Sequence, residues 1–101
     1  MITFNELVVN KDTVLLFILK DGVVVGSVTY NQENNELYNL LIDIKHRGEG
    51  NAEALLKEAM FRYRPKTITA SSCYGSDPVR LIKLYAKVGF KVDNVTMICS
   101  L

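Results

Sequence analysis

The sequence has little of what marks several large classes of protein. Its 101 residues carry a formal net charge of only +1, whereas a nucleic-acid-binding domain presents a strongly basic face. The two cysteines, Cys73 and Cys99, and the single histidine, His46, form neither a Cys-x-x-Cys pair nor another metal-ligand pattern. We therefore expect no nucleic-acid partner, no metal, and two reduced thiols in a cytoplasmic protein.

Long apolar stretches are also absent. The apolar run at residues 14–19 is much shorter than the roughly 20 residues that a membrane-spanning helix needs. Residues 1–6 lack the basic and apolar regions of a signal peptide. No repeat or linker divides the chain, whose length is that of one domain. The sequence thus predicts a single domain over residues 1–101 with no membrane partner.

The first half of the chain is rich in β-branched and apolar residues, which favour strands. We expect strands at 3–9, 14–19, 23–30 and 36–44. Asp21-Gly22 between the second and third strands is a strong hairpin signal, because both turn positions need positive φ. These strands predict an antiparallel meander whose last member, rich in Leu and Ile, is central and covered on both faces.

The second half changes period and predicts strand–helix–strand–helix–strand. Apolar residues recur at three- and four-residue steps over 52–63, which is typical of an amphipathic helix, and Pro65 ends it. A strand is expected at 66–71, a helix from Asp77-Pro78 to about residue 88 that ends at Gly89, and strand material at 90–92 and 95–99. The predicted class is α/β with a mixed sheet, with 36–44 and 66–71 parallel and helices on its faces.

A glycine-rich segment, Lys-His-Arg-Gly-Glu-Gly-Asn-Ala at 45–52, lies between the expected central strand and the first helix. Unpaired backbone N–H groups and the helix dipole favour an anion there, and phosphate is the usual one. The pattern is neither a P-loop nor Gly-x-Gly-x-x-Gly, since Glu53 stands where the third glycine belongs. The simpler alternative is a flexible helix start with a solvated Arg47.

Two motifs, in their order and spacing, resemble the GNAT N-acetyltransferase family. Arg-Gly-Glu-Gly-Asn-Ala at 47–52 is similar to the family's coenzyme loop, Arg/Gln-x-x-Gly-x-Gly/Ala. Leu-Tyr-Ala-Lys-Val-Gly-Phe at 84–90 is similar to its Leu-Tyr-x-x-x-Gly-Phe segment. The resemblance covers roughly residues 14–92 and implies an acyl-CoA N-acyltransferase fold with acetyl-CoA as co-substrate.

The resemblance also implies roles for individual residues. The phenol of Tyr85 would protonate the departing thiolate, a role that suits a pKa near 10; the alternative is an aromatic residue that only packs. Backbone groups would bind the pantetheine arm at Ile42, Asp43 and Ile44. Backbone amides would bind the pyrophosphate at Arg47, Gly48, Glu49, Gly50, Asn51 and Ala52.

The sequence departs from the family in two places. The family carries two helices between its first and second strands, where this chain has only residues 10–13, so the acceptor side should be open. A homodimer is one way to complete it. The asparagine that often precedes the tyrosine-bearing helix is replaced by Asp77 or Pro78. Three functions follow: transfer of acetyl to a primary amine, with a protein or peptide amine suiting the open side; CoA binding without catalysis; or protein interaction.

Overall fold

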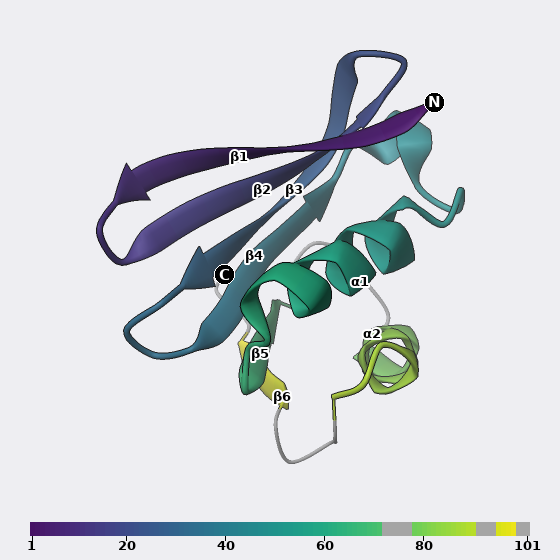
Figure 1. The fold of residues 1–101 in the computed structure, drawn as a ribbon. Coiled ribbons are helices and arrows are strands. Elements are labelled where there is room, and N and C mark those ends of the chain that lie inside the picture. The colour runs from purple at the N-terminus through teal and green to yellow at the C-terminus, as the bar shows by residue number, and fades with distance from the viewer. Residues whose placement is uncertain (72–77, 91–94, 99–101) are drawn as a thin grey trace.

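The computed structural model describes residues 1–71, 78–90 and 95–98 (Figure 1). The order of elements is the predicted one: four consecutive strands are followed by two strand–helix–strand crossovers. The elements, in order, are β1 (Ile2–Asn10), β2 (Thr13–Lys20), β3 (Val23–Asn31), β4 (Glu36–Ile42), a 3₁₀ turn η1 (Ile44–His46), α1 (Asn51–Tyr63), β5 (Thr67–Ser71), α2 (Pro78–Lys87) and β6 (Val95–Ile98).

The six strands form one sheet in the order β1-β2-β3-β4-β5-β6. Pairs from β1 to β4 are antiparallel, whereas β4–β5 and β5–β6 are parallel. The predicted meander and crossover are therefore confirmed. The hairpin between β2 and β3 turns at Asp21 (φ 52°) and Gly22 (φ 84°), both positive as the Asp-Gly signal requires.

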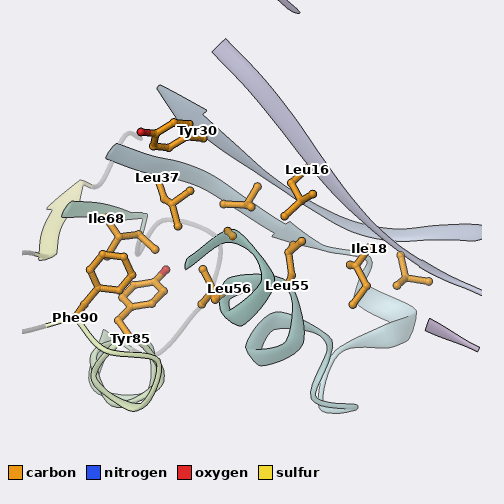
Figure 2. Packing of buried hydrophobic residues seen from close by; sticks show 12 residues of the cluster. Leu16, Ile18, Tyr30, Leu37, Leu55, Leu56, Ile68, Tyr85 and Phe90 are labelled. Carbon is orange, nitrogen blue, oxygen red and sulfur yellow. The ribbon is translucent and has the colours of Figure 1, made fainter. Parts of the chain in front are cut away.

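Both described helices pack on the same face of the sheet (Figure 1). Leu55 and Leu56 of α1 belong to one buried cluster with Tyr85 of α2 (Figure 2). The prediction that helices cover both faces is thus wrong for the described residues. Two right-handed crossovers that advance in one direction across a sheet put their helices on one face. The strand members of the cluster are Leu16, Ile18, Val25, Val28, Tyr30, Leu37 and Ile68.

The opposite face of the sheet carries residues that no described helix covers. Cross-strand partners share a face, and one such row runs Leu7, Leu15, Thr29 and Tyr38. The expectation that β4 is buried on both faces is wrong, since Leu41 is 49% exposed. Only Lys11 and Asp12 connect β1 to β2, so no helix is supplied there to cover this face.

Element ends differ from prediction where local hydrogen bonds compete with the regular structure. The strand β4 ends at Ile42 rather than Ile44, because Asp43 Oδ1 accepts from the Lys45 amide at 3.1 Å and starts the 3₁₀ turn. Phe90 is not in a strand: its amide donates to the Tyr85 carbonyl at 2.9 Å, after Gly89 with φ 116°. The predicted Asp77 cap, residues 91–92 and both cysteines lie outside the described residues.

None of the helices in the described segments is long and apolar enough to cross a bilayer. The acid-before-base pairs expected on the outer face of α1 are present. Arg62 Nε lies 2.6 Å from Glu58 Oε2, and Lys57 Nζ lies 3.8 Å from Glu53 Oε1. Exposed pairs of this kind contribute only a few tenths of a kcal/mol each, so the helix is held mainly by its buried stripe.

Candidate functional site

A β-bulge bends β4 in its middle. Tyr38 pairs with Thr29 and Leu41 pairs with Ser27, so two residues of β4 stand opposite the single residue between those partners on β3. Asn39 takes φ +56°, a left-handed conformation that asparagine tolerates better than most residues. Bulges bend the strand and disrupt its ladder. This bulge was not predicted, although an asparagine inside an apolar strand was its signal.

Strands β4 and β5 pair only where they begin. The register contains Glu36 opposite Thr67 and Leu37 opposite Ile68, and no further pair. A hydrogen bond of 2.5 Å from Thr69 Oγ1 to Glu36 Oε1 also ties the strands at this end. Beyond it β4 continues through the bulge to Ile42 without pairing with β5. Backbone groups on this edge of β4 are therefore not used by the neighbouring strand.

The segment between β4 and α1 has the left-handed glycines that the sequence predicts. Gly48 has φ +79° and Gly50 has φ +84°, and a Cβ built on either would meet nothing within 4 Å. Gly50 is the N-cap of α1 and offers no side-chain cap. The first helical bond is from the Ala54 amide to the Gly50 carbonyl at 3.1 Å. The amides of Asn51 and Ala52 thus lack helical acceptors, and the helix dipole makes this end attractive to an anion.

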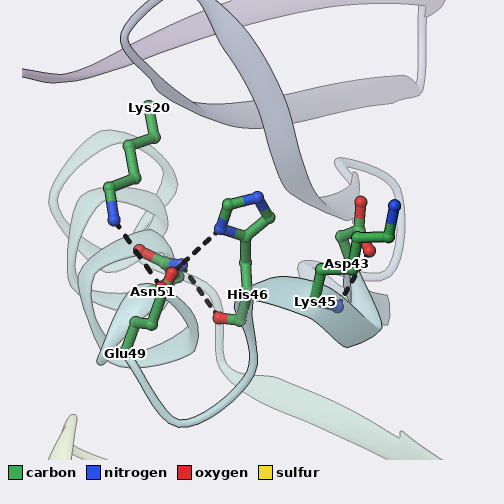
Figure 3. A network of polar contacts seen from close by, with 6 residues as sticks. All are labelled: Lys20, Asp43, Lys45, His46, Glu49 and Asn51. Atoms are coloured by element: carbon green, nitrogen blue, oxygen red, sulfur yellow. Dashed lines mark hydrogen bonds and ion pairs between the residues drawn. The ribbon is translucent and has the colours of Figure 1, made fainter.

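A polar network centred on Glu49 orders this segment (Figure 3). Its Oε1 lies 3.0 Å from His46 Nδ1 and accepts from Asn51 Nδ2 at 3.1 Å, and its Oε2 lies 3.7 Å from Lys20 Nζ. The hydrogen bond with His46, followed by that from Asn51, lowers the pKa of the Glu49 carboxyl. The buried Asn51 amide also donates to the His46 carbonyl at 3.1 Å. The Asn51 side chain therefore holds the loop together, while its backbone amide stays at the start of the helix.

Lys20 is a neighbour of the loop that sequence reasoning did not find. It ends β2, and the β2–β3 hairpin is distant from residues 47–52 along the chain. Only the antiparallel folding of the meander brings its ammonium group to Glu49. No local pattern in the sequence signals such a contact.

Arg47 joins the loop to the end of β4. Its Nε donates to the Ile42 carbonyl at 3.2 Å, and its side chain is exposed. Of the three residues predicted to bind an extended arm, Ile42 is the only one inside β4. The Asp43 amide donates to the Val25 carbonyl of β3 at 2.8 Å, and Ile44 lies in the 3₁₀ turn with its side chain exposed.

Tyr85 lies in the hydrophobic core. Its side chain is only 2% exposed, and its ring meets that of Phe90 edge to face at a centroid distance of 6.4 Å. Figure 2 shows it beside Ile68 and Leu56. Burial raises the pKa of the phenol to about 12, so the hydroxyl keeps its proton at neutral pH. The structure thus places Tyr85 in the packing position that was its alternative role, with its hydroxyl protonated.

The two helices are linked beside the loop. Lys87, the last residue of α2, places Nζ 2.9 Å from Oε1 of Glu53 in the first turn of α1. This contact, with a smaller contribution from Lys57, lowers the pKa of the Glu53 carboxyl. A negative side chain in the first turn also complements the helix dipole. The end of α2 is therefore held close to the start of α1.

Three features lie next to one another in the middle of the chain. They are the bulge in β4, the divergence of β4 from β5 and the glycine-rich start of α1. A family model described as "Acetyltransferase (GNAT) domain" matches residues 3–98. The chain belongs to the GNAT acetyltransferase family. This membership confirms the resemblance that residues 47–52 and 84–90 carry. No curated protein sequence matches the chain.

Solved structures of other GNAT proteins share the fold. AAC(6')-Iy, in complex with the bisubstrate analog CoA-S-monomethyl-acetylneamine, is 15% identical with a TM-score of 0.57, over 81% of this chain and 64% of that one. The aminoglycoside acetyltransferase HMB0005 from an uncultured soil metagenomic sample is 27% identical with a TM-score of 0.56, over 82% of this chain and 62% of its own. Ribosomal-protein-alanine N-acetyltransferase from Brucella melitensis biovar Abortus 2308 is 18% identical with a TM-score of 0.56, over 92% of this chain and 76% of that one. The chain thus spans less than two thirds of the two aminoglycoside-type enzymes.

Proposed function

We propose that this GNAT protein transfers an acetyl group from acetyl-CoA to a primary amine. The observation that carries the proposal is the uncapped, glycine-flanked start of α1 beside the unpaired edge of β4. An anion and an extended amide-containing chain are the two ligands that such groups bind, and CoA contains both. AAC(6')-Iy, which shares the fold, was solved with a CoA-containing analog.

In this proposal the pyrophosphate binds the backbone amides at residues 47–52. Gly48 and Gly50 leave the surface open, because no side chain stands where their Cβ atoms would be. The pantetheine arm lies along the end of β4 and the two residues that follow it, at residues 42–44, with the Ile42 carbonyl as its first acceptor. Since Arg47 Nε occupies that carbonyl at 3.2 Å, we expect the Arg47 side chain to turn toward the phosphates when the coenzyme binds.

The chemical step forms a C–N bond and breaks a C–S bond. The amine nitrogen attacks the thioester carbonyl, the amine proton passes to solvent water, and the tetrahedral intermediate collapses with departure of the CoA thiolate. Solvent water later returns this proton to the acid that protonates the thiolate. The thiolate takes a proton, which we assign to the Tyr85 hydroxyl. A phenol whose pKa is about 12 stays protonated until it is needed, and a positioned acid typically contributes a factor of about 10² to 10⁴ in rate.

The acceptor in this proposal is an amine on a protein or peptide. The tight connection at Lys11 and Asp12 leaves the sheet without the helices that enclose a small acceptor. An open surface admits a chain end or a lysine side chain more readily than it holds a small molecule, which needs a concave site.

A second candidate is a CoA-binding protein without turnover, and the burial of Tyr85 favours it. A side chain that is 2% exposed must gain access to the thiolate by some rearrangement of the core. Mass spectrometry of peptide amines incubated with acetyl-CoA and the protein separates the two candidates. Acetylated peptide in excess of protein supports transfer, whereas coenzyme binding with no acetylated peptide supports the second candidate.

A further inference from the structure

The outer edge of β1 is a long strand edge that no described strand covers. Among the strands that the structure describes, β2 is the only neighbour of β1. The register is regular from Ile2 to Val8, and its only shift comes between Val8 and Asn10, at the hairpin end. Folded proteins protect such edges with lysine, proline, bulges or short strands. β1 spans nine residues and contains neither lysine nor proline.

Exposed apolar side chains gather on this strand. Ile2 and Val8 lie on the α1 side of the sheet, since they pair with Lys20 and Val14 in the same alternation as Phe4 with the buried Ile18. Leu7 lies on the other side, opposite Leu15. Half of the ten exposed large hydrophobics in the described residues are within the first nine positions: Met1, Ile2, Leu7, Val8 and Val9. A patch of this kind marks an interaction surface.

The only charge on the strand is turned away from the edge. Glu6 Oε2 accepts from the Tyr63 hydroxyl at 2.6 Å and lies 3.8 Å from Arg62 Nη1. Both partners are at the end of α1, so the carboxylate is drawn under the sheet. Glu6 is therefore already paired within its own chain.

We propose that two copies of the chain pair through β1, antiparallel about a two-fold axis at Asn5, so that one sheet continues across a homodimer. This register places Ile2 opposite Val8 of the second copy and Thr3 opposite Leu7. Ile2 near one end of the strand and Val8 near the other are both apolar and exposed, so an antiparallel pair of two copies brings them together twice. This symmetry argues for a second copy rather than an unrelated strand.

The neighbouring registers are less favourable. An axis at Glu6 puts the two glutamates directly opposite each other, and like charges in that position are destabilising. An axis at Phe4 leaves Val8 and Val9 without partners. An axis that lies between two residues would pair side chains from opposite faces of the sheet, because side chains alternate along a strand. Only the axis at Asn5 uses the whole apolar edge.

The backbone is compatible with this register. The Asp21 amide donates to the Met1 carbonyl at 2.9 Å, so odd-numbered residues direct their backbone groups toward β2. In an antiparallel ladder the alternate residues then direct their backbone N–H and C=O groups away from β2. These residues are Ile2, Phe4, Glu6 and Val8. The two Asn5 residues form a non-hydrogen-bonded pair, where Cα atoms approach to about 4.5 Å. β2 and β3 separate this edge from β4, and the test measures association of the chain without coenzyme.

Sedimentation equilibrium over a range of protein concentrations tests the dimer. Ile2→Glu and Val8→Lys should each raise the dimer dissociation constant by at least about tenfold, since each occurs twice in the interface. The double variant Ile2→Glu/Val8→Lys should recover much of the loss, because opposite charges then face each other across the edge. Within one chain the two positions are six residues apart, roughly 20 Å, so they cannot compensate internally. Phe61→Lys, at an exposed apolar residue of α1, should change nothing.

Cysteine crosslinking tests the register itself. Asn5→Cys should form a disulfide-linked dimer on mild oxidation, because the Cα separation of the two copies of this position suits a disulfide. Leu7→Cys should crosslink no more than wild type with its native Cys73 and Cys99, since the two copies of that position are roughly 14 Å apart in this register. A wild-type monomer at every concentration overturns the proposal. So does a dimer that neither single charge weakens, or one in which Leu7→Cys crosslinks as readily as Asn5→Cys.

Discussion

The Nε atom of Arg47 donates a hydrogen bond of 3.2 Å to the carbonyl oxygen of Ile42. The contact joins the first residue of the glycine-rich loop at 47–52 to the last residue of β4. These are the two elements that we propose bind the pyrophosphate and the pantetheine arm. An arginine in this place can serve both, holding the strand end when the site is empty and meeting phosphate when it is filled.

Arg47→Ala should therefore weaken acetyl-CoA binding by about tenfold or more, since a hydrogen bond to a charged group typically contributes about 1.5–3 kcal/mol. The loss should shrink as salt is raised, because screening weakens the charge–charge part. Calorimetry at two ionic strengths checks both points. Lys11→Ala removes one positive charge from the β1–β2 turn and serves as the control. Equal coenzyme affinity in wild type and Arg47→Ala would exclude a phosphate contact.

Gly50 and Gly22 provide a matched pair for the loop. Both have φ +84° with nothing within 4 Å of a built Cβ. Alanine at either should cost about 1–2 kcal/mol of unfolding free energy, because positive φ is strained for L-residues. Only Gly50→Ala should lower acetyl-CoA affinity, since its methyl group stands in the proposed phosphate path. If chemical denaturation shows equal destabilisation but calorimetry shows equal affinity, the loop does not bind the coenzyme.

Asn39 tests whether the bulge in β4 is part of the site. Asn39→Gly keeps a residue that readily adopts φ +56°, so coenzyme affinity should be nearly unchanged. Asn39→Val places a β-branched side chain in that conformation and should cost about 1–3 kcal/mol of stability. We expect the valine variant that still folds to bind acetyl-CoA more weakly, because a straightened β4 pairs with β5. Unchanged affinity in the valine variant would separate the bulge from coenzyme binding.

Much of this arrangement follows from local patterns. The Asp21-Gly22 turn, the apolar stripe of α1 and its stop before Pro65 depend on neighbours in the sequence, and each was predicted. The bulge at Asn39 depends on how β4 aligns with β3, and the contact between Lys20 and Glu49 depends on the folded meander. The end of β4 was misplaced because Asp43 caps a turn, a local choice that the apolar Ile44 concealed.

Glu49 gives the loop a dependence on pH. The pKa of its carboxyl is lowered from 4.5, chiefly by the hydrogen bond with His46, so the ionised form stabilises the folded state above the unfolded pKa. That contribution is lost as pH falls through the lowered value. Glu49→Gln should flatten this part of the stability profile in acid, measured by denaturation between neutral pH and pH 3. It should also raise coenzyme affinity at neutral pH, because the substitution removes a negative charge beside the proposed phosphate position. An unchanged or lower affinity would contradict this.

Tyr85→Phe keeps the buried ring and removes the hydroxyl. If Tyr85 protonates the thiolate, acetyl transfer should fall by about 10² to 10⁴ with coenzyme affinity unchanged, the pattern of an interaction made in the transition state. Tyr85→Ala should instead lower stability by about 3–5 kcal/mol, because it empties a core position. Transfer at the wild-type rate by Tyr85→Phe, with chemistry rate-limiting, would show that the residue only packs.

Thermal denaturation with increasing acetyl-CoA tests the central claim most directly. A ligand at one hundred times its dissociation constant stabilises the folded state by about 2.7 kcal/mol, so we predict a saturable upward shift of the wild-type Tm. Gly22→Ala should show the same shift from its own baseline, and Gly50→Ala a much smaller one at equal ligand concentration. A wild-type Tm that does not move at the highest soluble acetyl-CoA concentration, with no heat in a calorimetric titration, would contradict the assignment of this loop as a coenzyme site.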